Sequence, residues 1–183
     1  MRRSFMVLAI LLIPSLTGCY LPLTAKVVDA ETGEPIEGAV VLVEWTIQKG
    51  IPGLVHGESY KAVSAVTNKD GKVTISGVFN PFVDPPQVTV YKKGYVAWNN
   101  LYIFPNSEDR QNFKYKNGMV IPLEKFKPDY SYIQHTMFIL SSINSGLGNP
   151  DSKKIMEDAI EWEENLAREE RDRQRTQPLK NGK

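Results

Sequence analysis

Short segments in which apolar and polar residues alternate fill residues 23–125, and this pattern constrains the fold more than any other feature of the chain. Val88 and Val90, for example, alternate with polar neighbours, as expected for a strand with one buried face. The run NKDG at residues 68–71 is a hairpin-turn signal, because its glycine can adopt a positive φ. About seven such segments, with turns about every 8–12 residues, predict a mainly β fold built as a sandwich of two sheets.

One segment lacks this alternation. Residues 40–45 read VVLVEW and are apolar at nearly every position. A strand of this composition is typical of a sheet covered on both faces. We therefore expect this strand to be covered on both sides.

Three motifs within residues 24–95 point to a known family. Residues 27–43, VVDAETGEPIEGAVVLV, match the pattern V-x-D-x-x-T-G-x-P-x-x-G-A-x-V-x-V at every fixed position. Residues 67–75, TNKDGKVTI, are similar to the hairpin pattern T-D-x-x-G-x-F-x-I, with Asn68 and Val73 as departures, and residues 88–95, VTVYKKGY, to L-x-V-x-x-x-G-Y. Through these motifs the segment resembles the carboxypeptidase regulatory-like domain. The resemblance implies a seven-stranded transthyretin-like (prealbumin-like) β-sandwich.

The same resemblance says little about activity. The matching residues form turns and fill a core, and the family shares no catalytic set; its members are usually accessory modules for folding, adhesion or binding. This sequence departs from the family in two longer stretches, Thr46–Glu58 and Val78–Pro86, which we expect to be loops. Loops that project from a rigid scaffold are where such a fold would carry a binding site.

The N-terminus resembles a secretory targeting signal. Arg2 and Arg3 precede an apolar run from Phe5 to Ile13, which is typical of a secretory signal and too short for the roughly 20 residues of a membrane-spanning helix. The tetrad LTGC that ends at Cys19 resembles the bacterial lipobox. That resemblance implies a diacylglyceryl group on the Cys19 sulfur, cleavage before Cys19 and acylation of the new amine; an ordinary signal with a chance cysteine is the alternative.

The residue after the cysteine bears on location. Residue 20 is Tyr, whereas an Asp at this place tends to retain Gram-negative lipoproteins at the inner membrane. The resemblance therefore implies a lipid-anchored protein of the cell envelope, on the periplasmic face of the outer membrane if the source is Gram-negative.

Charge and cysteine content exclude several classes of function. Lys and Arg together number 22 and Asp and Glu 21, so nothing electrostatic favours nucleic acid as a partner. One cysteine and two histidines exclude a cysteine-rich zinc site. We expect no cofactor and no metal.

Beyond residue 125 the periodicity becomes helical. Pro128 and Asp129 indicate the start of one helix, and a second is expected from Asp151 or Ser152. On the second helix an apolar stripe recurs at spacings of four, three and four; its members are Ile155, Ala159, Trp162 and Leu166. The stripe predicts packing on the helix's own domain or on the preceding helix, with a partner-binding helix as the alternative. The expected parts of the chain are a signal peptide at 1–18, a lipidated N-terminus and linker at 19–22, the β-sandwich at 23–125, a helical extension at 126–176 and a disordered tail at 177–183.

Few side chains suggest chemistry. His56 lies two residues before Glu58, but no nucleophile accompanies them, and a solvated loop is expected. His135 is expected at a surface or as a satisfied, semi-buried histidine. The remaining candidates are acids: Glu161, Glu163 and Glu164, interpreted as a charged helix face, and Asp29, Glu31, Asp70 and Asp84, whose separation in sequence does not indicate a calcium site. We expect no catalytic residue.

Aromatic residues offer the remaining binding candidates. Phe79, Phe82, Trp98 and Tyr102 lie close in sequence, and exposed rings on a β scaffold can stack on sugars or anchor a protein partner. Two functions stay open. The first is a non-enzymatic, membrane-anchored lipoprotein that serves as a structural or protein-interaction module of the envelope. The second is a lipoprotein that binds carbohydrate or another small ligand through the sandwich loops.

Overall fold

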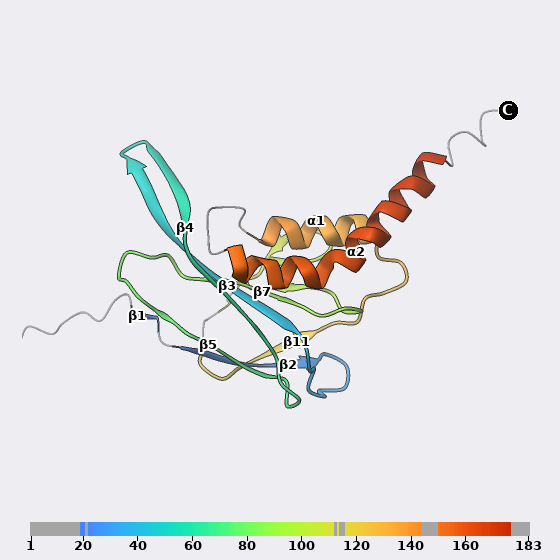
Figure 1. Cartoon of the computed structure of the whole chain (residues 1–183), viewed down its shortest axis with the longest axis horizontal. Helices are drawn as coiled ribbons and strands as arrows, with labels where there is room; N and C mark the ends of the chain where they lie inside the picture. Colours follow the sequence, from blue (N-terminus) through green and yellow to red (C-terminus); the bar gives the residue numbers. More distant parts are fainter. Residues whose placement is uncertain (1–18, 21, 112, 114–115, 144–149, 177–183) are drawn as a thin grey trace, which may run out of the picture.

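The computed structural model describes residues 19–20, 22–111, 113, 116–143 and 150–176, so the expected signal peptide and C-terminal tail lie outside the described residues. Most of the described elements are strands, with two helices at the C-terminal end (Figure 1). The elements in chain order are β1 Cys19–Tyr20, β2 Leu23–Asp29, β3 Val40–Ile51, β4 Leu54–Val66, β5 Lys72–Ile75, β6 Val78–Phe79, β7 Gln87–Tyr91, β8 Trp98–Asn99, β9 Tyr102–Ile103, β10 Glu108–Asp109, β11 Met119–Leu123, α1 Tyr132–Ser142 and α2 Pro150–Thr176. The expectation of a mainly β chain with a C-terminal helical extension is confirmed.

Two sheets form the body of the molecule. One has the strand order β11-β2-β5, with β11 parallel to β2, and the other has the antiparallel order β4-β3-β7-β8. Two further pairs, β1-β6 and β10-β9, stand apart from them. Buried residues from both main sheets make one hydrophobic core; they include Val27, Val73 and Ile121 from the first sheet and Val41, Trp45 and Val88 from the second.

Alternation in the sequence explains which faces are buried. In β2 the side chains of Leu23, Ala25 and Val27 are buried, and those between them are only partly so. The turn before β5 depends on Gly71, which has a φ of 71°, and a Cβ there would lie 2.4 Å from the Val27 carbonyl oxygen. Only glycine can occupy that position without moving the neighbouring strand.

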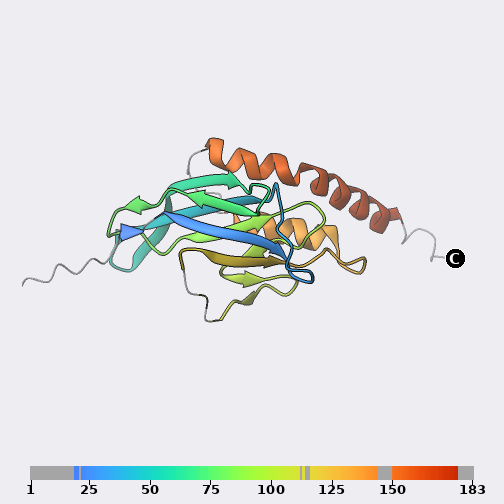
Figure 2. The same ribbon diagram turned by 90° about the horizontal axis from the view of Figure 1, so that it is seen from below.

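Both helices cover the outer face of the four-stranded sheet (Figures 1 and 2). A second hydrophobic core lies there and combines sheet and helix residues; it includes Val40, Leu42, Tyr91, Phe138, Ile139, Met156 and Ile160. Residues 40–45 of β3 are buried on both faces, as their unbroken apolar run predicted. The helices therefore pack against the same strands that form the core between the sheets.

The helix boundaries differ from the sequence-based expectation. Helix α1 begins at Tyr132 and not near Pro128, because Ser131 is its N-cap and accepts the Gln134 amide with its side chain. Helix α2 begins at Pro150, where the missing N–H of proline costs no hydrogen bond. It continues for 27 residues, about 40 Å, to Thr176. Neither helix in the described part of the chain is long and apolar enough to cross a membrane.

The segment expected to be a loop at Thr46–Glu58 is instead a two-stranded arm. Strands β3 and β4 stay paired from Thr46↔Ser59 to Ile51↔Leu54, beyond a register shift at Trp45/Thr46. Gly50 and Gly53 both have positive φ, so only a tight turn separates the strands. This arm projects from the body at the end of the molecule where β1 lies (Figure 1). The glycines that suggested a loop thus shape a hairpin tip.

Candidate functional site

Phe79 and Phe82 lie beside the point where the described chain begins. Strand β1 pairs with β6 in the register Cys19↔Phe79 and Tyr20↔Val78. The Phe79 side chain is 86% exposed and that of Phe82 is 78% exposed. These two predicted binding residues are therefore both accessible, and Phe79 is the register partner of the predicted lipidation residue Cys19.

Asp84 fixes the position of this loop. Its N–H donates to the Thr46 carbonyl oxygen at 2.8 Å, and its carboxylate accepts the Gln48 amide at 2.7 Å and the Thr46 hydroxyl at 3.1 Å. Because Thr46 and Gln48 belong to the projecting arm, the loop and the arm are held together. A further bridge between Ile47 and Val83 adds to this attachment.

Trp98 lies at a different place and in a different state. Its side chain is only 9% exposed, and the Arg110 guanidinium carbon lies 4.9 Å from the centroid of its ring. Phe113 packs edge-on with a centroid distance of 5.5 Å. The cation covers a ring face that a sugar would need for stacking, so Trp98 is not an open aromatic platform.

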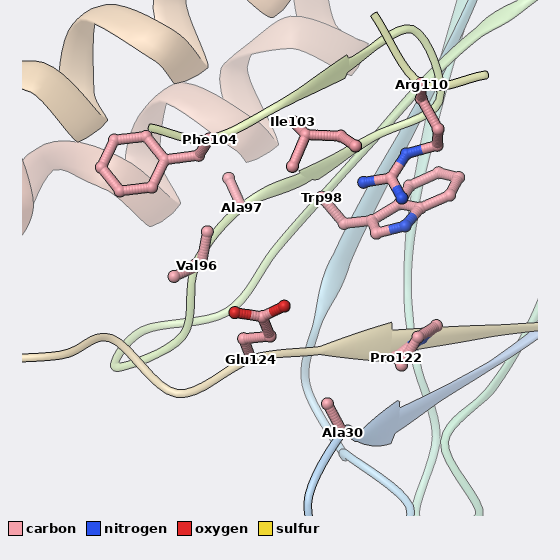
Figure 3. Close-up of a pocket in the computed structure, with 9 residues that line it drawn as sticks. All are labelled: Ala30, Val96, Ala97, Trp98, Ile103, Phe104, Arg110, Pro122 and Glu124. Carbon is pink, nitrogen blue, oxygen red and sulfur yellow. The ribbon is translucent and has the colours of Figure 1, made fainter. Parts of the chain in front are cut away.

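A pocket of about 220 Å³ lies next to Trp98 (Figure 3). Arg110 and Glu124 give it one positive and one negative group, and its other walls are mostly apolar; they include Ala30, Val96, Ile103, Phe104 and Pro122. The Arg110 Nε donates to the Asn99 carbonyl oxygen at 2.8 Å, and burial lowers the pKa of this guanidinium from its usual value. The arrangement suits a small ligand that carries both charges.

Tyr102 does not complete this pocket. It lies in β9, is 38% exposed and donates its backbone N–H to the Asn99 side chain. The four aromatic candidates are thus divided between two regions of the molecule. Arg110 and Glu124 were not singled out from the sequence, because no motif marks an isolated arginine or glutamate as pocket residues.

His135 is buried and takes part in a network between α1, α2 and the sheet. Its Nε2 accepts the Ala97 N–H at 2.8 Å, so the proton of the ring lies on Nδ1, which contacts the Glu163 carboxylate. The other Glu163 oxygen accepts the Tyr91 hydroxyl at 2.8 Å, and Trp162 Nε1 donates to that hydroxyl at 2.7 Å. Burial and the Glu163 carboxylate both raise the pKa of Tyr91, which keeps its hydroxyl protonated as a donor. With His135 and Glu163 at 0% and 1% exposure, the network is a packing device and not a site open to substrate.

Glu163 corrects the interpretation of the three glutamates as one charged helix face. Glu161 is exposed and Glu164 pairs with Arg168 at 3.4 Å, but Glu163 is buried against His135 and Tyr91. Its two hydrogen-bonding partners offset the cost of removing the carboxylate from water. Those partners are distant in sequence, so the helical pattern alone does not reveal them.

The other polar candidates lie in different parts of the fold. Glu58 forms an ion pair with Lys49 at 2.8 Å on the arm, where His56 is exposed. Asp29 accepts the Glu31 and Thr32 amides and the Tyr95 hydroxyl, and so organises a turn. Over the residues that the structure describes, no group of three or more His, Cys, Asp or Glu side chains is arranged to hold a metal ion.

Comparisons with known proteins leave the family open. No family model matches the chain, and no curated protein does. Among solved structures, a streptococcal ancillary pilin is similar to it with a TM-score of 0.29 and 16% identity, over 58% of this chain and 29% of the pilin chain. A likeness at this level supports no inference about function.

Proposed function

We propose that this protein is a non-enzymatic lipoprotein, anchored to a membrane of the cell envelope through Cys19, whose folded body serves as a structural or protein-interaction module. The tetrad LTGC after a short apolar run carries the proposal, because residue types, spacing and position all resemble a lipobox. Two or more acyl chains, at about 0.8 kcal/mol per buried methylene, would hold the chain firmly at a bilayer.

The position of Cys19 in the fold is compatible with this anchor. Strand β1 begins at Cys19, and the buried residue Leu23 follows four positions later. An acylated Cys19 would therefore hold the folded body close to the lipid surface.

We also propose that the body is a transthyretin-like sandwich. The supporting features are the three-stranded and four-stranded sheets around a common core, and the positive φ of Gly33, Gly38 and Gly71 at positions of the family motifs. In such a module the loops and the surfaces that the helices leave uncovered would be available to partners, while the motif residues maintain the fold.

The anchor is tested by replacing its sulfur. We expect Cys19→Ala to incorporate no labelled palmitate and to leave the membrane fraction, whereas the parent protein is labelled and sediments with membranes. Tyr20→Asp is the matched control, since it keeps Cys19 and should keep the label; in a Gram-negative host it should move to the inner membrane. Equal membrane association of Cys19→Ala and the parent would refute the anchor.

The interaction role is tested in the envelope itself. Crosslinking of intact cells, followed by purification of the lipidated protein, should recover a specific partner that the Cys19→Ala variant loses. If no partner is recovered specifically, the interaction role is rejected and the anchor is unaffected.

The pocket beside Trp98 supports a second candidate, binding of a small ligand. Its observation is the pair Arg110 and Glu124 on the walls of a cavity of about 220 Å³. A ligand from a panel of glycans, peptidoglycan fragments and zwitterionic compounds should raise the melting temperature of the parent and not of Glu124→Ala. No shift across the panel would reject this function.

A further inference from the structure

Five exposed apolar side chains lie in two segments that are attached to each other. Phe79 and Phe82 belong to the loop that begins with β6, and the tip of the arm contributes Ile51, Leu54 and Val55, which are 65%, 73% and 59% exposed. The arm tip and β1 lie at one end of the molecule's long axis, and the C-terminal end of α2 lies at the other (Figures 1 and 2). We call these five residues the apolar end.

Exposure of five large apolar side chains at one end of a protein is unfavourable in water. Single exposed apolar residues are ordinary on protein surfaces, but several large ones in neighbouring segments indicate an interaction surface. Phenylalanine and branched aliphatic side chains are also the residues that gain most from entering the hydrocarbon of a bilayer.

Lys49, Glu58 and Asp84, the Lys and acidic side chains of these two segments, each have a partner. On the arm, Lys49 and Glu58 neutralise each other in an ion pair of 2.8 Å. At the loop, the Asp84 carboxylate is held by hydrogen bonds from Gln48 and Thr46. The apolar end can therefore approach acyl chains without taking an unpaired carboxylate from these residues out of water.

We propose that the apolar end inserts into the outer part of a phospholipid bilayer and fixes the orientation of the body on the membrane. This inference rests on the proposed function, because the position of Cys19 identifies the bilayer as the occupant. Cys19 pairs with Phe79 across β1 and β6, so acyl chains on Cys19 bring the bilayer to the exposed phenylalanines. With this end in the membrane, the long axis points away from it and the end of α2 projects outward.

The experiment supplies the lipid chemically. Cys19 is the one cysteine of the chain, and the protein from Cys19 onward contains every element that the structure describes. A maleimide-headgroup phospholipid in phosphatidylcholine vesicles can therefore tether it at the proposed position, whether or not cells lipidate it. Tryptophan is then introduced at Phe82 or Leu54 as a depth reporter, and quenching by brominated acyl chains is measured against the tethered parent.

The matched control lies on the same hairpin. Strand β4 runs from Leu54 to Val66, and Val66 is 51% exposed about 40 Å away from the tip along the strand. We expect the added fluorescence of Phe82→Trp and of Leu54→Trp to be quenched at least about threefold more than that of Val66→Trp. All three sites are exposed, so unchanged circular dichroism is expected to show that the fold is retained.

The two proposals fail in different ways. Equal quenching at Phe82→Trp and Val66→Trp would overturn the insertion, whatever the state of Cys19 in cells, and would be the result if a protein partner or a second copy covered the apolar end. Absence of acyl chains on Cys19 in mass spectra of the protein from cells would instead overturn the proposed function and leave the vesicle result intact.

Discussion

At the scale of single residues, the buried pair His135 and Glu163 depends most on correct hydrogen bonding. Each side chain has two partners: the imidazole contacts the Ala97 amide and Glu163, and the carboxylate contacts His135 and the Tyr91 hydroxyl. A buried polar group that loses its partner retains the cost of desolvation without the compensating hydrogen bond. The network therefore fixes where α1 and α2 sit on the sheet.

Glu163→Ala should lower the free energy of unfolding by about 3–5 kcal/mol, because it leaves the His135 and Tyr91 donors buried without their acceptor. Chemical denaturation followed by circular dichroism measures the change. Glu161→Ala is the matched control on the same helix; since Glu161 is exposed, its effect should stay within about 0.5 kcal/mol. Equal effects of the two substitutions would show that the buried network does not stabilise the fold.

The lowered pKa of Asp29 should make the stability of the fold depend on pH. The Thr32 amide, with help from Glu31, Tyr95 and Lys125, lowers the pKa of its carboxyl group below the usual value. A carboxyl group whose pKa is lower in the folded state stabilises the fold above its unfolded pKa of about 3.9, and this contribution disappears as the pH falls through the folded pKa.

Asp29→Asn should therefore be less stable than the parent at pH 7, and the difference should shrink as the pH falls below about 4. Melting temperatures measured from pH 7 to pH 2 test this. Asp70→Asn removes a carboxylate from an exposed turn position and serves as the comparison. A difference between Asp29→Asn and the parent that stays constant at every pH would contradict the expectation.

At the scale of elements, the buried face of α2 differs from the one that its apolar residues predict, because the buried face includes a glutamate. The apolar stripe in the sequence starts at Ile155, but Ile155 is 42% exposed, and the face turned to the protein is displaced by one position along the helix. Its fully buried members are Met156, Ile160, Glu163 and Ala167. Their spacing is again four, three and four, so the period was predicted correctly and the phase was not.

The same helix completes the start of α1. The Glu170 carboxylate accepts the Ser131 hydroxyl at 2.7 Å and the Tyr132 amide at 2.8 Å. It thus occupies the positive end of α1, where the first amides have no partner within the helix. This contact links the N-terminal end of α1 to the C-terminal half of α2.

Glu170→Ala should destabilise the protein by about 0.5–2 kcal/mol, the range for loss of a helix N-terminal cap. Hydrogen exchange should show faster exchange at the amides of Tyr132 and Ile133, while that of the central strands is unchanged. Glu169→Ala, an exposed neighbour, should change neither quantity. Unaltered exchange at Tyr132 in Glu170→Ala would refute the capping role.

At the scale of the whole molecule, the helices close a core that the sheet cannot close alone. The outer face of β3 and β7 presents Val40, Leu42 and Tyr91, and these are buried by residues of α1 and α2. Beyond Ala167, by contrast, none of the α2 side chains whose burial the structure describes is buried. The two parts of α2 should therefore contribute differently to stability.

Deleting residues 150–183 should expose this core, lower the melting temperature sharply and increase binding of a hydrophobic dye, because apolar area returns to water. Deleting only residues 174–183 should leave the melting temperature within about 2 °C of the parent, as expected for a free-energy change below about 0.5 kcal/mol. Calorimetry of both truncations tests the division. Equal stability of the two truncations would show that α2 does not complete the core.

The sequence by itself determined the mainly β character, the two-sided burial of residues 40–45, the existence of the two C-terminal helices, and the spacing of the apolar residues along the second helix. These properties depend on local chemistry, namely the period of the apolar residues and the glycines at turns. The helix starts at Tyr132 and Pro150 differ from the expected ones. Phe79, Phe82 and Trp98 were all named from the sequence as aromatics close together, but the sequence did not separate the two exposed rings from the buried Trp98.

Only the tertiary structure decided which contacts join distant parts of the chain. It paired β1 with β6 and so placed Cys19 against Phe79, converted the expected loop at Thr46–Glu58 into an arm, and buried Glu163 on His135. It also covered Trp98 with Arg110. The arm is a local hairpin, whose glycines fit either a loop or a tight turn until its two strands are seen paired. The contacts of Cys19 with Phe79 and of Glu163 with His135 depend on the energy of pairs whose members lie far apart in sequence, and no local pattern in either segment contains that energy.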